Sequence, residues 1–120
     1  MYASHLAQNA YAPETSFKSA RDIEYDAFAR ITGALKRATS ATDRAEALHK
    51  NRQLWTILAI DVADKGNALP ASLRAEILSL AQFTMQHTSK VLAGSQTIDA
   101  LVEINTSMMR GLRGDKDLAA

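Results

Sequence analysis

Apolar residues recur at three- and four-residue steps through most of this 120-residue chain. That spacing is typical of one buried face of an α-helix. Four such stretches can be separated, over residues 19–39, 41–64, 70–93 and 97–112. No segment of any length alternates apolar and polar residues as a half-buried strand would. Because the links between the stretches are short, neighbouring helices should be antiparallel. The pattern therefore predicts an all-α fold, a compact antiparallel bundle of about four helices.

The two ends of the chain lack this periodicity. Ser19 followed by Asp22 predicts the start of the first helix, because a carboxylate in the first turn faces unpaired N–H groups. Residues 1–18 are therefore expected to form a flexible tail. At the other end, two glycines interrupt the last helix. The sequence predicts one helical domain over residues 19–114, followed by a disordered tail at 115–120.

The second helix has the broadest apolar arc of the four. It carries the only tryptophan, Trp55, which we expect in the core where this helix meets at least two others. Two asparagines interrupt apolar stripes, Asn51 in the second helix and Asn105 in the fourth. A buried amide needs hydrogen-bond partners. These residues are therefore interpreted either as structural, fixing the register of packed helices or capping a neighbouring helix terminus, or as polar anchors in a groove for a partner helix.

Turn-forming residues join the second helix to its neighbours. Ser40 and Asp43 offer a capping arrangement at its start. At its end, Gly66 is suited to a left-handed helix cap, and Asn67 lies in the turn, where its side chain can bond nearby backbone N–H groups. Pro70 opens the third helix, since its missing N–H costs nothing at a first helical position. Pro70 and Asn67 are expected to set this corner.

Two carboxylates lie close to the end of the second helix. Asp61 and Asp64 are three residues apart, at the helix end where negative charge is unfavourable unless it is paired. Lys65 and Arg74 are the nearest cations in the sequence. The pattern predicts an ion pair between the second and third helices.

The charge balance argues against several classes of partner. Fourteen basic and thirteen acidic residues give a net charge of +1, and no like-charged run exceeds two residues. A nucleic-acid binder normally gathers basic residues on one face. The longest nearly apolar run, residues 54–60, is far shorter than the ~20 residues of a membrane-spanning helix. The N-terminus lacks a signal-peptide pattern, so we expect a cytoplasmic protein that does not insert into membranes.

No set of residues in the sequence is typical of an active site or a metal site. The chain has no cysteine, and its three histidines, His5, His49 and His87, are scattered between the tail and two helices. Zinc needs three or four converging ligands. The five glycines are isolated, so no phosphate-binding loop is present. The sequence indicates a protein without catalytic residues, metal or cofactor.

Three short blocks occur in a fixed order along the chain. The first is N-x-x-L-W-x-x-L-x-x-D at residues 51–61, the second is N-x-L-P-x-x-L-R-A at 67–75, and the third is E-I-N at 103–105. Their order and spacing resemble the FlaF family of alphaproteobacterial flagellar biosynthesis regulators, from about residue 19 to residue 114. The matching positions are Asn51, Leu54, Trp55, Leu58, Asp61, Asn67, Leu69, Pro70, Leu73, Arg74, Ala75, Glu103, Ile104 and Asn105.

The resemblance implies a role in making flagella. FlaF-like proteins are required for production and export of flagellin and act opposite FlbT, a post-transcriptional repressor of flagellin expression. The resemblance therefore implies a non-enzymatic, chaperone-like adaptor that binds flagellin, FlbT or both. The alternative is a regulator that contacts flagellin mRNA directly, which would need a basic track or an aromatic stacking platform.

A helical receptor for a flagellin terminus should present uncovered apolar residues. Flagellin termini are amphipathic helices that stay unpaired until assembly, and a groove between helices can receive one. Leu6 and Tyr11 in the N-terminal tail are apolar residues in a segment that cannot fold alone. Met108 and Met109 on the fourth helix, together with Met85, would give a groove an adaptable surface. Leu6, Tyr11, Met108 and Met109 are therefore the predicted partner-binding residues.

Overall fold

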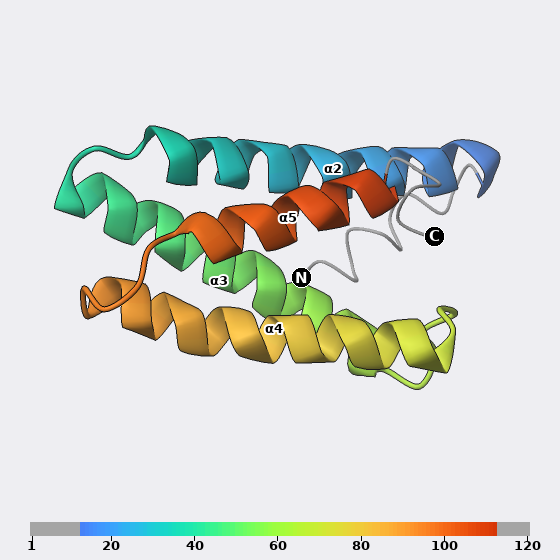
Figure 1. The fold of residues 1–120 in the computed structure, drawn as a ribbon. Coiled ribbons are helices and arrows are strands. Elements are labelled where there is room, and N and C mark those ends of the chain that lie inside the picture. The colour runs from blue at the N-terminus through green and yellow to red at the C-terminus, as the bar shows by residue number, and fades with distance from the viewer. Residues whose placement is uncertain (1–12, 113–120) are drawn as a thin grey trace.

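The computed structural model describes residues 13–112, with side-chain packing from residue 24 onward, and this part of the chain is entirely helix and short connections. It contains four helices, α2 (Pro13–Arg37), α3 (Ala41–Ala63), α4 (Ala71–Leu92) and α5 (Asp99–Leu112). Each helix runs antiparallel to the one before it, and α5 lies across the bundle beside α2 (Figure 1). The predicted all-α antiparallel bundle is confirmed. Of the tails predicted at 1–18 and 115–120, residues 1–12 and the whole of 115–120 lie outside the described residues.

The first helix starts earlier than its sequence predicts. α2 begins at Pro13, so the expected start at Ser19 is wrong and residues 13–18 belong to the helix. Proline is favoured in the first turn because its fixed φ suits a helix and its missing N–H has no partner there in any case. Serine and aspartate mark a helix start only when the preceding residues leave the helical conformation, and here they do not.

The second of the four helices, α3, forms the centre of the bundle. It packs most extensively on α4 and also contacts α2. Seven of its residues are buried, and they are Ala47, Leu48, Asn51, Leu54, Trp55, Leu58 and Val62. The side chain of Ser40 accepts a hydrogen bond of 3.0 Å from the Asp43 N–H and so caps its start, as predicted. The broad apolar arc of α3 thus reflects contact with several neighbours.

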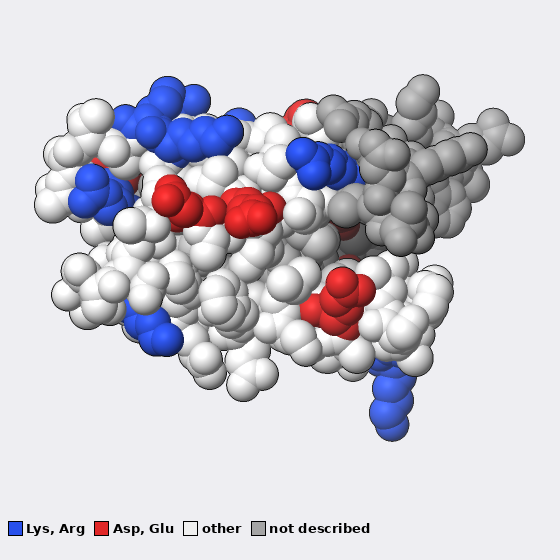
Figure 2. Space-filling view, in the orientation of Figure 1, with Lys and Arg blue, Asp and Glu red and all other residues white. Residues whose placement is uncertain are grey.

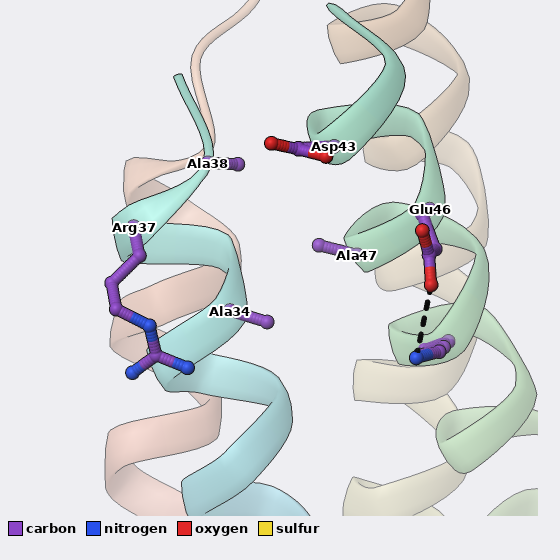
Figure 3. A pocket seen from close by; sticks show the side chains of 7 residues that line it. Ala34, Arg37, Ala38, Asp43, Glu46 and Ala47 are labelled. Atoms are coloured by element: carbon purple, nitrogen blue, oxygen red, sulfur yellow. Dashed lines mark ion pairs between the residues drawn. The ribbon is translucent and has the colours of Figure 1, made fainter. Parts of the chain in front are cut away.

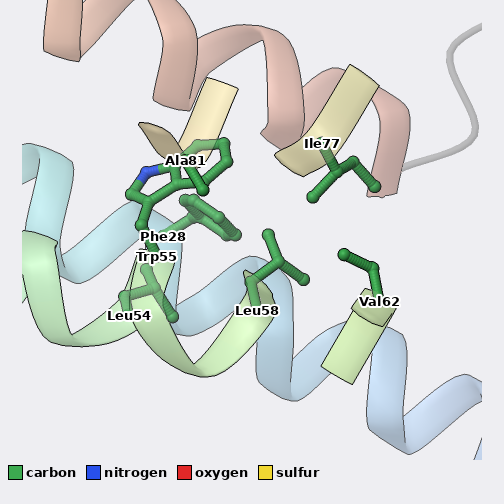
Figure 4. Close-up of a cluster of buried hydrophobic side chains, with 7 residues drawn as sticks. All are labelled: Phe28, Leu54, Trp55, Leu58, Val62, Ile77 and Ala81. Carbon is green, nitrogen blue, oxygen red and sulfur yellow. The ribbon is translucent and has the colours of Figure 1, made fainter. Parts of the chain in front are cut away.

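The core divides into two clusters along the bundle. The larger one joins Phe28 of α2, four residues of α3, and Ile77 and Ala81 of α4 around Trp55 (Figure 4). The rings of Phe28 and Trp55 meet edge to face with their centroids 5.7 Å apart, a favourable geometry for aromatic pairs. The second cluster contains Leu35, Ala47, Leu48, Val91 and Leu101. The prediction that Trp55 lies in the core between several helices is confirmed.

The third of the four helices, α4, ends in a glycine cap. Gly94 has a φ of 83°, its N–H donates to the Val91 carbonyl (3.0 Å), and the Ser95 N–H donates to the Lys90 carbonyl (2.9 Å). These two bonds define a Schellman motif. Gly66, which was predicted to cap α3 in the same way, does not adopt positive φ. The end of α3 is stabilised by other groups.

Candidate protein-binding surface

A polar network crosses the centre of the bundle between α3 and α5. The Nδ2 group of Asn105 donates to Oδ1 of Asn51 (2.7 Å), and the indole Nε1–H of Trp55 donates to Oδ1 of Asn105 (2.9 Å). All three side chains are completely buried. Because a buried amide bonds well in only one alignment, this network favours a single register of α5 on α3. The geometry agrees with the first interpretation of the asparagines, a structural role, and their side chains do not reach the surface.

Three buried polar atoms lack a hydrogen-bond partner among the described residues. They are Nδ2 of Asn51 and the hydroxyl oxygens of Thr32 and Thr84. Each comes from a different helix, α2, α3 or α4. Unpaired buried polar groups lower stability. These three atoms also make the interior of the bundle more polar than the apolar stripes of the sequence indicate.

Two side chains from the following segment bond the carbonyl groups at the end of α3. The guanidinium of Arg74 donates to the carbonyl of Val62 (2.7 Å) and to that of Asp64 (3.0 Å). Nδ2 of Asn67 donates to the carbonyl of Asp61 (3.1 Å), while its Oδ1 accepts from the Leu69 N–H (3.0 Å). The last carbonyls of a helix have no partner within it, and cations are favourable there. Asn67 and Arg74 therefore set the corner between α3 and α4.

The predicted ion pair at this corner is wrong. Among the described residues, no carboxylate of Asp61 or Asp64 lies within ion-pair distance of a cation, and the pair found is Glu46–Lys50 (3.2 Å). Arg74 instead bonds backbone oxygens. Its planar, multiply donating group suits two carbonyls at once. Pro70, expected at the first helical position, lies one residue before it as the N-cap of α4.

Replacing Arg74 by methionine should lower the free energy of unfolding by about 1–2 kcal/mol, because two charge-assisted bonds to helix-end carbonyls are lost. Asp61→Asn is the matched test of the ion-pair alternative and should not destabilise the protein. Urea denaturation followed by circular dichroism measures both. Equal destabilisation of the Asp61→Asn and Arg74→Met proteins would show that the carboxylate, and not the carbonyls, is the partner of Arg74.

A carboxylate with an altered pKa lies beside this corner. Burial away from water, and then the neighbouring Asp61 carboxylate, raise the pKa of Glu24 from its ordinary 4.5 to about 7. Burial and the nearby Asp64 carboxylate also raise the pKa of Asp61. Three acidic side chains from α2 and α3 thus gather at one end of the bundle. A folded-state pKa above the unfolded value means that stability from this group falls as the pH rises.

Glu24→Gln should therefore stabilise the protein at pH 8 but not at pH 5. Between pH 4.5 and about 7 the folded state binds more protons at Glu24 than the unfolded state does. The free energy of unfolding of the wild type should fall as the pH rises through this window. Glutamine cannot ionise, so the variant should not show this loss. Because Glu24 is partly exposed, we expect a gain on the order of 1–2 kcal/mol at pH 8. Urea midpoints at both pH values measure it, with the exposed Glu103→Gln on α5 as the control. An equal gain at both pH values would contradict the prediction.

The predicted partner-binding residues fall in two groups. Leu6 and Tyr11 lie outside the described residues. Met108 and Met109 are half-buried and pack against the larger core cluster. This contact helps to hold α5 on the bundle. Of the family-block residues, Leu54 and Leu58 belong to that same cluster, whereas Leu69, Leu73 and Glu103 are exposed.

The large apolar side chains that the bundle leaves exposed lie mostly on the outer sides of α3 and α4. They are Ile60, Leu69, Leu73, Leu78, Phe83 and Leu92. None was among the predicted partner-binding residues. The sequence does carry a signal for them, since residues 54–60 and 77–89 contain no Asp, Glu, Lys or Arg. In a chain whose basic and acidic residues are otherwise spread along its length, a long uncharged stretch of helix indicates a face that is not simply exposed to solvent.

Ile60 and Leu78 lie on the same side of the junction between α3 and α4. The Thr56 hydroxyl of α3 approaches the Met85 sulfur of α4 at 4.0 Å, which fixes where the two helices meet. Ile60 is four residues after Thr56, and Leu78 is seven before Met85. Because the helices are antiparallel, both steps lead toward the same end of the junction. We call Thr56, Ile60, Leu78 and Met85 the α3–α4 surface.

A shallow pocket of about 240 Å³ lies at the other end of the bundle, where α2 turns into α3. Its floor is made of alanines, and Arg37, Asp43, Glu46 and Lys50 surround it (Figure 3). The carboxylate of Glu46 pairs with Lys50 along the same helix. Two cations and two carboxylates surround the pocket, so it does not favour ligands of either charge.

Neither a metal site nor a membrane-spanning helix is found among the described residues. No group of three or more His, Asp or Glu side chains among them is arranged to hold a metal ion. None of the four helices is long and apolar enough to cross a membrane. His87, which is buried, is bonded through Nε2 to the Thr97 carbonyl (2.9 Å) and stacks on Phe83.

Comparison with known proteins gives one match. The family model described as flagellar protein FlaF matches residues 7–112, nearly the whole chain. The match begins before residue 19, where the resemblance in the sequence starts, and it includes all three sequence blocks. Searches of curated proteins and of solved structures each found no match.

Proposed function

The chain belongs to the FlaF family of flagellar proteins, and from this we propose that it promotes flagellin synthesis or export as an adaptor that binds a protein partner. The partner we propose is flagellin, presented as an amphipathic helix. The observation that supports this most is the α3–α4 surface, where apolar side chains are exposed on two helices with uncharged runs at residues 54–60 and 77–89. A helix can bind such a surface through its own apolar face.

The composition of the α3–α4 surface supports a protein partner more than RNA. Ile60 and Leu78 are exposed, Met85 is half-buried beside them, and the runs 54–60 and 77–89 that contain these residues are uncharged, with Asp61 and Arg74 outside them. Methionine adapts its shape to a partner because its side chain is unbranched. RNA recognition relies on cations that contact phosphates, and the α3–α4 surface has none. FlbT remains the second protein candidate, since it acts on the same flagellin messages.

The test is co-purification of flagellin with tagged protein from cells that make flagella. Ile60→Glu and Leu78→Glu should each reduce recovery at least tenfold, because charging a buried anchor typically costs 2 kcal/mol or more of binding. Leu92→Glu is the matched control. It alters an exposed leucine of the same helix, but one that lies 14 residues, or about 21 Å, from Leu78. Recovery with Leu92→Glu should equal that of the wild type.

Two outcomes would overturn the proposal. Equal recovery of flagellin with all three variants would remove the α3–α4 surface from the interaction. Recovery of flagellin mRNA, with salt-sensitive binding in an electrophoretic shift assay, would instead favour direct control of the message.

A further inference from the structure

The outward face of α4 carries an exposed aromatic residue centred between two opposite charges. Glu76, Phe83 and Lys90 are separated by seven residues each, so they lie almost in line along one face of the helix. All three are exposed, as are Ser79 and Gln86 between them. Figure 2 shows the same order on the molecular surface, with acidic colour over the N-terminal part of α4, basic colour toward its C-terminal end and only uncharged atoms between.

This face is distinct from the α3–α4 surface. Phe83 and Leu78 are five residues apart, which places them about 140° apart around the helix. Met85, which meets α3, lies on the side of Leu78. On its own side, Phe83 stacks on the buried His87 with ring centroids 5.2 Å apart and remains 43% exposed. One side of the Phe83 ring is therefore packed inside the bundle, and the other is open.

We propose that this face binds a second copy of the chain, with the two α4 helices antiparallel across a two-fold axis that passes near Phe83. Phe83 is the midpoint between Glu76 and Lys90. In such a pair each Glu76 therefore lies opposite the Lys90 of the other copy, and the two Phe83 rings meet at the axis. An isologous contact requires a self-complementary surface, and an acid, an aromatic and a base in this order provide one.

The chemistry of the intervening residues suits this contact. Ser79 is small and Gln86 is uncharged, so neither opposes close approach of a second helix. A parallel arrangement would place Glu76 against Glu76 and Lys90 against Lys90, which is unfavourable. A contact along one helix is small compared with stable interfaces of about 1,200–2,000 Å². We therefore expect a weak dimer, with a dissociation constant of about 10 µM to 1 mM.

Analytical ultracentrifugation of the purified full-length chain up to about 1 mM tests the proposal. Phe83→Glu should leave the chain monomeric over this range. Leu78→Glu, which charges a leucine 38% exposed on the other side of the same helix, should dimerise as the wild type does. Circular dichroism establishes that the variants are folded. This measurement uses no flagellin, so its result is independent of the proposed function.

A charge exchange tests the antiparallel geometry without altering the aromatic contact. Glu76→Lys and Lys90→Glu each place like charges opposite one another twice, and each should weaken the dimer about tenfold at low salt. An equimolar mixture of the two variants should form a heterodimer with wild-type affinity, because opposite charges then face each other at both ends. The doubly exchanged chain should also recover.

A wild-type chain that is monomeric at about 1 mM would overturn the proposal. So would a dimer unaffected by Phe83→Glu, or single charge variants that do not combine. If the chain is monomeric and Phe83→Glu instead abolishes flagellin recovery, the face binds that partner and not a second copy.

Discussion

Trp55→Ala is expected to lower the free energy of unfolding by about 3–5 kcal/mol. The side chain is fully buried, contacts the Phe28 ring edge to face, and donates its indole N–H to Asn105. Its removal leaves both a cavity and an unpaired acceptor. Since domains of this size are stable by about 5–15 kcal/mol, the thermal midpoint should fall by more than about 10 °C.

Trp55→Phe separates the two parts of this effect. Phenylalanine retains aromatic packing on Phe28 but has no N–H for Asn105, so its cost should be smaller than that of alanine. Leu92→Ala, an exposed position on α4, is the control and should change stability by about 0.5 kcal/mol or less. Thermal unfolding followed by circular dichroism measures all three. A midpoint that moves only a degree or two in Trp55→Ala would contradict the central position of this residue.

The helices and the core could be predicted because they depend on periodicity. Apolar residues at three- and four-residue steps identify the buried face of a helix even when its exact ends are not known. Trp55, Leu54 and Leu58 followed from that pattern, and so did the burial of Asn51 and Asn105, which interrupt it. The antiparallel order of the helices followed from their short connections.

The helix ends were harder to predict because several local signals compete at each one. At the start of α2, Pro13 and Ser19 are both acceptable starts, and the helix takes the earlier one. At the end of α3, Gly66 offers a local cap, yet Arg74 reaches back from α4 to bond the final carbonyls. A cap supplied from the next helix depends on how the two helices pack, and neither sequence stretch contains that information.

The candidate surface was missed for a related reason. A broad apolar arc shows that a helix has several neighbours, but it does not fix the crossing angles that decide which residues they cover. Met108 and Met109 were expected to be uncovered, and they pack partly on the core instead. Ile60 and Leu78 are left exposed. The uncharged runs of residues 54–60 in α3 and 77–89 in α4 are the sequence feature that indicates this surface, and the prediction did not use them.

The polar network between α3 and α5 gives the other large expected effect. Asn105→Leu should cost about 2–5 kcal/mol, although leucine has a similar size and is apolar. Asn105 is the acceptor for Trp55 and the donor to Asn51, so the substitution leaves two polar groups buried without those bonds. Nδ2 of Asn51 already lacks a partner among the described residues, so the whole Asn51 amide would then be unpaired.

A double-mutant cycle with Asn51→Leu identifies the hydrogen bond as the cause. When both asparagines are leucine, only the indole N–H of Trp55 loses its partner. The double variant should therefore be more stable than the sum of the single effects implies, by about 0.5–3 kcal/mol. Urea denaturation of the four proteins measures this coupling energy. Strictly additive effects would mean that the two amides act separately, and the network would then not fix the register of α5. A strong coupling would show that a hydrogen bond between residues 54 positions apart in sequence selects how α5 packs on α3.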